Sequence, residues 1–265
     1  MTPALVDMAI GPASDVGQAR DSLARRIVVH GHWVSEQAAT PDEADPRRYP
    51  LRYLLGVLLD QGIPWEAAWR GPRVLEERLL AAGYGSMTPT TLSSIDVDVL
   101  EKLIRLPPSL HRFPRKMAKW IRNAATQVET LYQGDAARIW SDGLGAHEVI
   151  RRFDRFEGIA QKKSTMATNI LARDYEYPIT GWADIDVSYD VHVRRVFLRS
   201  GLASRDSADA IVAAARELYP RYPGNLDLGA WDIGKNWCRP SNPQCGTCPL
   251  ASDCPRLLDV RVPRS

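Results

Sequence analysis

All four cysteines of this chain lie close together near its C-terminus, and this feature constrains the fold more than any other. The segment reads CRPSNPQCGTCPLASDC, and the rest of the 265 residues contains no thiol. The four positions are Cys238, Cys245, Cys248 and Cys254. In a reducing compartment such thiols do not pair as disulfides, so a bound metal group explains them better.

The composition fits such a compartment. With 45% hydrophobic and 25% charged residues, the chain has the make-up of a soluble globular protein. No apolar run approaches the roughly 18 residues of a membrane span. The N-terminal MTPALVDMAIGPASDVGQAR lacks a basic stretch followed by an apolar one, so we expect no secretory signal and a cytoplasmic location. A net charge of +2 neither requires nor excludes a nucleic-acid partner.

The cysteine spacing favours a cluster over a single ion. Zinc modules usually bring their cysteines as two short C-x2-C pairs separated by a longer span. Here the spacing is C-x6-C-x2-C-x5-C, one short pair flanked by two wider loops. Four thiolates in one compact loop suit a [4Fe–4S] cluster, in which each iron takes one cysteine ligand. Zinc is the alternative.

Apolar periodicity predicts an almost entirely helical chain with no strand-like alternation. The run 51–59 is too uniformly hydrophobic for a surface helix, so we expect it to be buried. Residues 1–20 are rich in small side chains and are expected to be frayed, and Asp21 is a candidate cap for the first helix. Helices are expected over 21–36, 51–59, 65–82, 96–105, 114–132, 145–154, 162–173, 190–200, 205–218 and 227–236.

Residues 145–173 read as two helices joined by a tight turn that holds Gly158. Such a turn directs unpaired backbone N–H groups at a phosphate, helped by the positive end of the second helix. This kind of contact holds a nucleic-acid backbone without reading its sequence. The turn therefore predicts a DNA contact, although an ordinary pair of helices is the alternative.

Together with the cysteine loop, this turn resembles the endonuclease III and MutY branch of the helix-hairpin-helix (HhH-GPD) DNA glycosylases. The family pattern L-P-G-V-G-R-K-T-A corresponds here to FEGIAQKKS, in which Glu157 and Ala160 replace the proline and the second glycine. The resemblance implies that Lys162 is the nucleophile of a bifunctional enzyme. Lys163 takes that role if the turn differs by one residue. An amine attacks a sugar carbon only when unprotonated, which requires partial desolvation.

The stretch YDVHVRRV resembles the family's V-D-T-H-I-F-R-V, with Asp190 in register. The resemblance implies that Asp190 is the catalytic carboxylate, which stabilises the sugar cation formed as the base leaves. A helix cap is its alternative or additional role. Asp184 and Asp186 are weaker rivals. The interval between Lys162 and Asp190 is longer than the family's, and the aromatic residues of this extra loop either stack on an extruded base or pack internally.

Two softer matches concern side chains that enter the duplex. Gln61 aligns with the glutamine of the family's S-A-Q-A-T, which fills the gap left by the flipped base. Leu110, His111 and Phe113 form a turn before a run of basic residues, where the family places a wedge that kinks the duplex. We expect Leu110 or Phe113 to be the wedge. Together with Gly158, Ala160 and Lys163, these residues form the expected DNA-binding set.

The resemblance implies an all-α fold of two helical domains flanking a DNA-binding cleft. A helical barrel over 45–165 would end in the hairpin, and 21–44 with 166–265 would form the iron–sulfur domain, after a flexible 1–20. The implied function is base-excision repair: flipping a damaged base of double-stranded DNA, cleaving its N-glycosidic bond, and nicking the strand through a lysine Schiff base. The alternatives are a monofunctional glycosylase and a non-catalytic iron–sulfur DNA-binding protein. We expect a monomer without membrane contact, associated with the nucleoid if bacterial.

Overall fold

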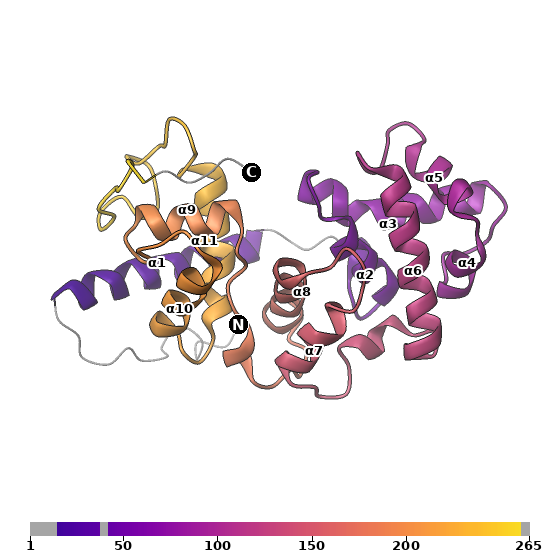
Figure 1. Ribbon diagram of the computed structural model, residues 1–265, viewed down its shortest axis with the longest axis horizontal. Coiled ribbons are helices and arrows are strands. Elements are labelled where there is room, and N and C mark those ends of the chain that lie inside the picture. The colour runs from indigo at the N-terminus through magenta and orange to yellow at the C-terminus, as the bar shows by residue number, and fades with distance from the viewer. Residues whose placement is uncertain (1–14, 38–41, 261–265) are drawn as a thin grey trace. The chain divides into compact units, whose positions relative to one another are not determined.

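The computed structural model describes residues 15–37 and 42–260. Within those ranges the protein is helical, without a β-strand, and the only sheet-like pairing is an isolated bridge between Gly145 and Thr180. The chain divides into two compact units, the first formed by residues 1–38 and 181–265 and the second by 39–180 (Figure 1). The predicted all-α class is confirmed.

The second unit contains the apolar helix predicted to be buried. Its elements are η2 (Asp42–Ala44), α2 (Pro50–Leu59), α3 (Trp65–Ala81), α4 (Pro89–Ser94), α5 (Val97–Arg105), α6 (Pro114–Tyr132), η3 (Ala136–Ile139), α7 (Ala146–Phe153) and α8 (Gln161–Arg173). Nearly every residue of α2 is buried, and α3, α6 and α8 all pack against it. This explains why α2 has no polar face.

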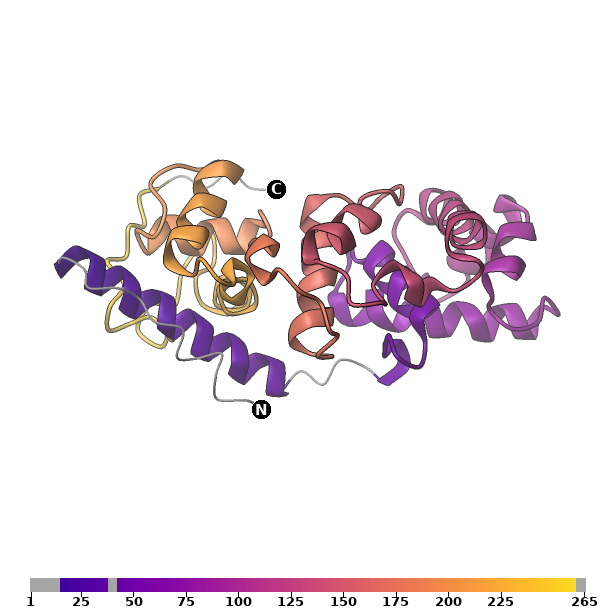
Figure 2. The ribbon, with the colours of Figure 1, turned by 90° about the horizontal axis from the view of Figure 1, so that it is seen from below.

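The first unit is built around two helices from opposite ends of the chain. Its elements are α1 (Asp15–Gln37), η4 (Trp182–Asp184), α9 (Val191–Arg199), α10 (Ala208–Leu218), η5 (Pro223–Leu226) and α11 (Asp227–Asn236). Helix α11 contacts both α1 and α9, and Figure 2 shows α1 running along one side of this unit. Leu23 and Ile27 of α1 join Phe197 and Ile233 in one apolar core.

The close approach of α1 and α11 depends on a glycine. A Cβ atom at Gly229 would lie 1.9 Å from the backbone oxygen of Ile27 and 3.0 Å from the backbone nitrogen of Gly31. No side chain fits between two backbones at that distance. The N-terminal helix is thereby joined to the segment that leads directly into the cysteine loop.

Most predicted helices are present within a few residues of their expected bounds, but the N-terminus differs. Helix α1 begins at Asp15, so residues 15–20 are helical rather than frayed, and Asp21 lies inside the helix and is not its cap. Arg20 explains the extension, because its guanidinium pairs with Glu217 and donates to the backbone oxygen of Leu202. The remainder of the expected flexible segment, 1–14, lies outside the described residues.

A short helix, α4, was not predicted. Its sequence, PTTLSS, has weak helix propensity and little apolar periodicity. Thr88 caps it by accepting a hydrogen bond from the Thr91 backbone N–H at 3.0 Å, and Pro89 occupies the first helical position. Packing against α6 supplies the remaining stabilisation.

The division into units differs from the one expected from the sequence. A boundary at residue 165 would fall inside α8, whereas all of α8 belongs to the second unit. Two hydrogen bonds of 2.7 Å fix α8 to α2: the Tyr53 hydroxyl donates to the Ala167 oxygen, and Lys163 Nζ donates to the Leu58 oxygen. At the other boundary, η2 contacts α2 and α3 and so belongs to the second unit rather than with α1.

None of the helices in the described ranges is both long enough and apolar enough to cross a membrane.

Candidate functional site

The turn between α7 and α8 has a geometry that only glycine allows. Gly158 has a φ of +90°, in the left-handed region, and a Cβ atom there would lie 2.3 Å from a ring carbon of Trp120. Phe156 and Ile159, on either side, are buried and anchor the turn in the second unit. The sequence singled out this glycine, and the structure adds the ring that packs against it.

Ala160 replaces the second glycine of the family pattern without strain. Its φ is −130°, which is ordinary extended backbone. It is the N-cap of α8 but makes no side-chain cap bond, and the first turn of this helix carries no acid. Exposed Glu157 accepts a hydrogen bond of 2.8 Å from the Asn123 amide. The N-terminus of α8 therefore has neither a side-chain cap nor an acidic residue in its own first turn.

The two adjacent lysines have different surroundings. Lys162 is exposed on the first turn of α8. Lys163 is only 8% exposed, and its ammonium group donates to the Leu58 oxygen and lies 5.9 Å from the centre of the Trp120 ring. Burial lowers the pKa of Lys163 to about 8. Lys162 thus has the access that a nucleophile needs, and Lys163 has the lowered pKa.

Gln61 and the expected wedge lie in neighbouring loops of the second unit. Gln61 directly follows the C-cap of α2 and is partly buried. Its backbone oxygen lies 2.9 Å from Nε2 of His111. Phe113 is 42% exposed, with the Arg112 guanidinium 4.7 Å from the ring centre, whereas Leu110 is partly buried. Of the two residues predicted as the wedge, Phe113 is therefore the more exposed.

His111 does not fit its predicted role as a DNA contact. The residue is only 2% exposed, and both ring nitrogens are hydrogen-bonded inside the protein, so neither is available to DNA. The basic run that follows is also partly committed. Arg115 pairs with Asp98 and Glu101, and Arg122 donates to the Ser93 oxygen.

Asp190 belongs to the first unit and caps α9. Its carboxylate accepts a hydrogen bond of 2.7 Å from the His192 backbone N–H, and the residue is 6% exposed. Of its rivals, Asp186 pairs with Arg216 at 2.7 Å, and Asp184 is exposed on η4. Asp190 is the only one of the three that is buried and that caps a helix of this unit.

The structure adds a carboxylate that the sequence did not single out. Asp227, at the start of α11, accepts a hydrogen bond of 2.6 Å from the Ser188 backbone N–H. The Ser188 oxygen in turn accepts from the Asp190 backbone N–H at 2.8 Å. Asp227 therefore fixes the turn that presents Asp190. No local pattern predicts this contact, because it joins segments far apart in the chain.

The longer loop between α8 and Asp190 has an internal packing role. Tyr175 is buried and packs edge-on against Tyr53, and Tyr177 does the same against Trp140. Trp182 packs against Tyr222 within the first unit. These aromatic residues were expected either to stack on an extruded base or to pack internally. The contacts that they make are those of internal packing.

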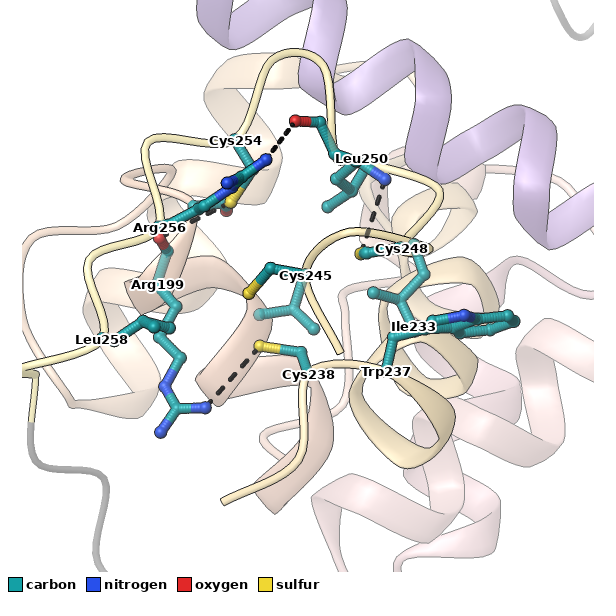
Figure 3. A pocket seen from close by; sticks show the side chains of 13 residues that line it. Arg199, Ile233, Trp237, Cys238, Cys245, Cys248, Leu250, Cys254, Arg256 and Leu258 are labelled. Atoms are coloured by element: carbon teal, nitrogen blue, oxygen red, sulfur yellow. Dashed lines mark hydrogen bonds between the residues drawn. The ribbon is translucent and has the colours of Figure 1, made fainter. Parts of the chain in front are cut away.

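The four cysteines line one pocket together with apolar and arginine side chains (Figure 3). Arg199 holds the loop, because its guanidinium lies 4.0 Å from the Cys238 sulfur and donates to the backbone oxygens of Arg239 and Pro240. The Leu250 N–H lies 3.5 Å from the Cys248 sulfur. In the described part of the chain no three Cys, His, Asp or Glu side chains converge as ligands of one ion would. The thiols instead surround a space.

Comparison with known protein families shows which family this fold and its cysteine loop resemble. Residues 55–221 match the model of the HhH-GPD superfamily of base excision DNA repair proteins. The chain belongs to this superfamily. Residues 238–254 of this HhH-GPD protein match the iron–sulfur binding domain of endonuclease III, and that range holds all four cysteines. The [4Fe–4S] cofactor predicted from the spacing is thereby confirmed.

Solved structures agree with the HhH-GPD fold. A trapped endonuclease III–DNA covalent intermediate in an estranged-adenine complex is similar at TM-score 0.62 and 18% identity, over 89% of this chain and 96% of that one. A non-covalent endonuclease III–DNA complex gives the same score and identity, over 89% and 95%. A thermostable thymine-DNA glycosylase is similar at TM-score 0.59 and 14% identity, over 92% and 98%. No curated protein sequence matches this chain.

The chemistry of the thiols fits a highly charged metal group. Burial raises the pKa of Cys238 and Cys254, and that of Cys248 to about 11, while Arg199 opposes the shift at Cys238. Such buried thiols hold their protons unless cationic iron compensates for the thiolate charge. Cys238, Cys245, Cys248 and Cys254 would each ligate one iron, with no open position for substrate chemistry.

Proposed function

We propose that this HhH-GPD protein is a bifunctional DNA glycosylase that removes a damaged or modified base from double-stranded DNA and then nicks the strand. One observation carries the proposal. An exposed amine, Lys162, stands on the first turn of a helix whose positive end follows a glycine turn and is not capped by a side chain. A phosphate bound at that end would bring the sugar of a nearby nucleotide toward the amine.

Lys162 rather than Lys163 is the proposed nucleophile because it is accessible. Lys163 would have to break its bond to the Leu58 oxygen and leave a buried position before it could reach a sugar. Its lowered pKa favours the free amine, but its geometry suits a structural role. The two lysines therefore give opposite expectations when each is replaced.

The proposed reaction begins with the glycosidic bond. As the base leaves with the bonding electrons, the Asp190 carboxylate stabilises the positive charge that develops on the sugar. The Lys162 nitrogen, unprotonated when it attacks, forms a bond to C1′ and gives up one proton, which neutralises the departing base. The C1′–O4′ bond then breaks, O4′ takes up a proton from water, and the nitrogen lone pair forms the C1′=N bond of a protonated Schiff base. Removal of a proton from C2′ then forms a C2′–C3′ double bond and expels the 3′ phosphate. This scheme requires the two units to bring both residues to one nucleotide.

Side chains of the second unit would support the extruded state. Extruding a base costs a few kcal/mol, less at a lesion. Phe113 offers an exposed ring to wedge between base steps, and the Gln61 amide offers donors and an acceptor to the orphaned base. The cluster, held by the four cysteines, would stabilise its own loop. We propose that one copy of the chain suffices, since all these groups come from a single chain.

Borohydride trapping tests the proposal. The protein is mixed with duplexes that each carry one lesion, drawn from oxidised pyrimidines, mismatched thymine or uracil, 8-oxoguanine and modified bases. Base release and covalent adducts are scored with and without borohydride. We expect an adduct that Lys162→Ala abolishes and Lys163→Met retains. Base release without any adduct would establish the monofunctional alternative, and no release with any lesion, together with full DNA binding by Asp190→Asn, would favour the non-catalytic one.

A further inference from the structure

The imidazole of His111 lies buried between the two loops expected to enter the duplex. Its Nε2 is 2.9 Å from the backbone oxygen of Gln61. Its Nδ1 is 3.0 Å from the backbone nitrogen of Phe113. Gln61 follows α2 and Phe113 precedes α6, so one ring joins two elements that are far apart in sequence.

The partners of the ring determine its tautomer. A backbone N–H can only donate, so Nδ1 must accept from Phe113 and carry no proton. A carbonyl oxygen can only accept, so Nε2 must carry the proton and donate to Gln61. The neutral imidazole satisfies both bonds, whereas the imidazolium carries a proton on Nδ1 and loses the bond to Phe113.

The surroundings favour this neutral state. Burial lowers the pKa of His111, and the charges of Lys163, Arg112 and Lys116 act in the same direction. The bond to the Gln61 oxygen opposes the shift. These cations come from α8, from the turn itself and from α6, so the ring meets positive charge from each of these directions.

The backbone around both loops is also fixed. The Ser109 hydroxyl donates to the backbone oxygen of His111 at 3.0 Å, which adds a second contact within this turn. Lys163 donates to the Leu58 oxygen, just before Gln61. The loop that carries Gln61 is therefore attached to α8 through Lys163 and to the Phe113 turn through His111.

We propose that His111 is a positioning residue that couples Gln61 to Phe113, so that the two side chains enter the duplex as one mechanical unit. Its role in DNA distortion rests on the proposed function, but the link itself is a property of the free protein. Without this link, the Gln61 loop and the Phe113 turn would each adopt the DNA-inserted conformation independently.

Two substitutions each remove one of the two hydrogen bonds of the His111 ring and keep the other. In His111→Asn, the side-chain oxygen replaces Nδ1 and keeps the acceptor for the Phe113 N–H, but nothing reaches Gln61. In His111→Gln, the amide nitrogen replaces Nε2 and keeps the donor to Gln61, but the acceptor is lost. Each variant retains one native bond, and thermal unfolding monitored by circular dichroism checks that both fold.

The free protein provides a test independent of catalysis. Nitrogen-15 NMR of the wild-type imidazole is expected to show the Nε2–H tautomer at neutral pH. On acidification, the amide signals of Gln61 and Phe113 should shift together with the ring, and the exchange of the Phe113 amide should accelerate at least about threefold in His111→Gln but not in His111→Asn. A ring in the Nδ1–H form, or independent titration of the two loops, would overturn the link.

A DNA test then measures coupling. The probe is a duplex containing a tetrahydrofuran abasic-site analogue beside 2-aminopurine, and its fluorescence reports distortion without base release. In wild type, Gln61→Ala and Phe113→Ala should each reduce the fluorescence change. The product of these two fold-reductions should exceed the fold-reduction in the double variant at least about threefold. In both His111 variants, the fold-reduction in fluorescence caused by the double substitution should equal the product of the two single fold-reductions. Unchanged coupling would overturn the proposal, whereas a wild-type protein that fails to distort this probe would refute the proposed function and leave the NMR outcome to judge the link.

Discussion

The ammonium group of Lys163 donates a hydrogen bond of 2.7 Å to the backbone oxygen of Leu58, and so fastens the first turn of α8 to the end of α2. Its neighbour Lys162, one position earlier on the same turn, is exposed. The bond places a titratable group inside the second unit and holds the hairpin against the loop that carries Gln61.

The buried Lys163 predicts a dependence of stability on pH. Burial lowers the pKa of Lys163 from 10.5 to about 8. Between pH 8 and pH 10.5, this side chain therefore binds more protons in the unfolded chain than in the folded one. Relative to Lys163→Met, the wild-type free energy of unfolding should rise as the pH increases from 8 to 10.5, by about 1.4 kcal/mol per unit at most. Urea unfolding across this range measures it. Lys162→Met should track the wild type, and parallel pH profiles for wild type and Lys163→Met would contradict the prediction.

Gly158 predicts a steric cost. Alanine there must adopt a φ of +90° and would place its Cβ 2.3 Å from the Trp120 ring. We expect Gly158→Ala to lower the free energy of unfolding by at least about 2 kcal/mol, as measured by denaturant titration. The matched control is Gly83→Ala in the same unit, because Gly83 also has a positive φ, +81°, but no neighbour lies within 4 Å of a Cβ at that position. Equal stability of the two variants would show that the turn adapts.

Asp190 has a capping role and a proposed catalytic role, and substitution can separate the two. Asparagine is as good an N-cap as aspartate, so Asp190→Asn should keep the bond to the His192 N–H and leave stability nearly unchanged. Asp190→Ala should lose about 1 kcal/mol. Both should lose base release, measured in single-turnover assays on whichever lesion the wild type excises. Full activity of Asp190→Asn would remove the carboxylate from the proposed mechanism.

Asp227 should act on the reaction through Asp190. Removing its carboxylate in Asp227→Ala leaves the buried Ser188 N–H without this acceptor, at a cost of about 1.5–3 kcal/mol in the free energy of unfolding. We expect slower single-turnover base release with little change in DNA affinity. Asp227→Asn retains an acceptor and should recover most of the rate. A larger loss in affinity than in rate would instead indicate a contact with DNA.

The cysteine loop predicts the consequence of losing a ligand. In Cys248→Ser, we expect the broad visible absorbance of the cluster to disappear and bound iron to fall well below about four per chain. The first unit should unfold at a lower temperature, because Cys238, Cys248 and Cys254 pack against its core. Lys163→Met, in the other unit, should keep its iron. A full complement of zinc with no visible absorbance in the wild-type protein would contradict the cofactor assignment.

Local features determined much of the fold in advance. The bounds of α6 follow from Pro114 at its first position and from the apolar periodicity beyond it, and both are properties of contiguous sequence. The cysteine spacing and the glycine turn are equally local. For this reason the helices, the hairpin and the cluster loop could be predicted, whereas the start of α1 and the presence of α4 could not, since contacts with distant residues stabilise both.

The amino-acid sequence by itself determined the helical class, the glycine turn and the four-cysteine loop of the cluster, because each depends on residues within a few positions of one another. Only the tertiary structure decided which of two adjacent lysines is buried. Consecutive residues on a helix point about 100° apart, so the packing of α8 against α2 enclosed Lys163 and left Lys162 exposed. The same is true of His111 and Asp227, whose partners are brought to them only when distant segments pack together.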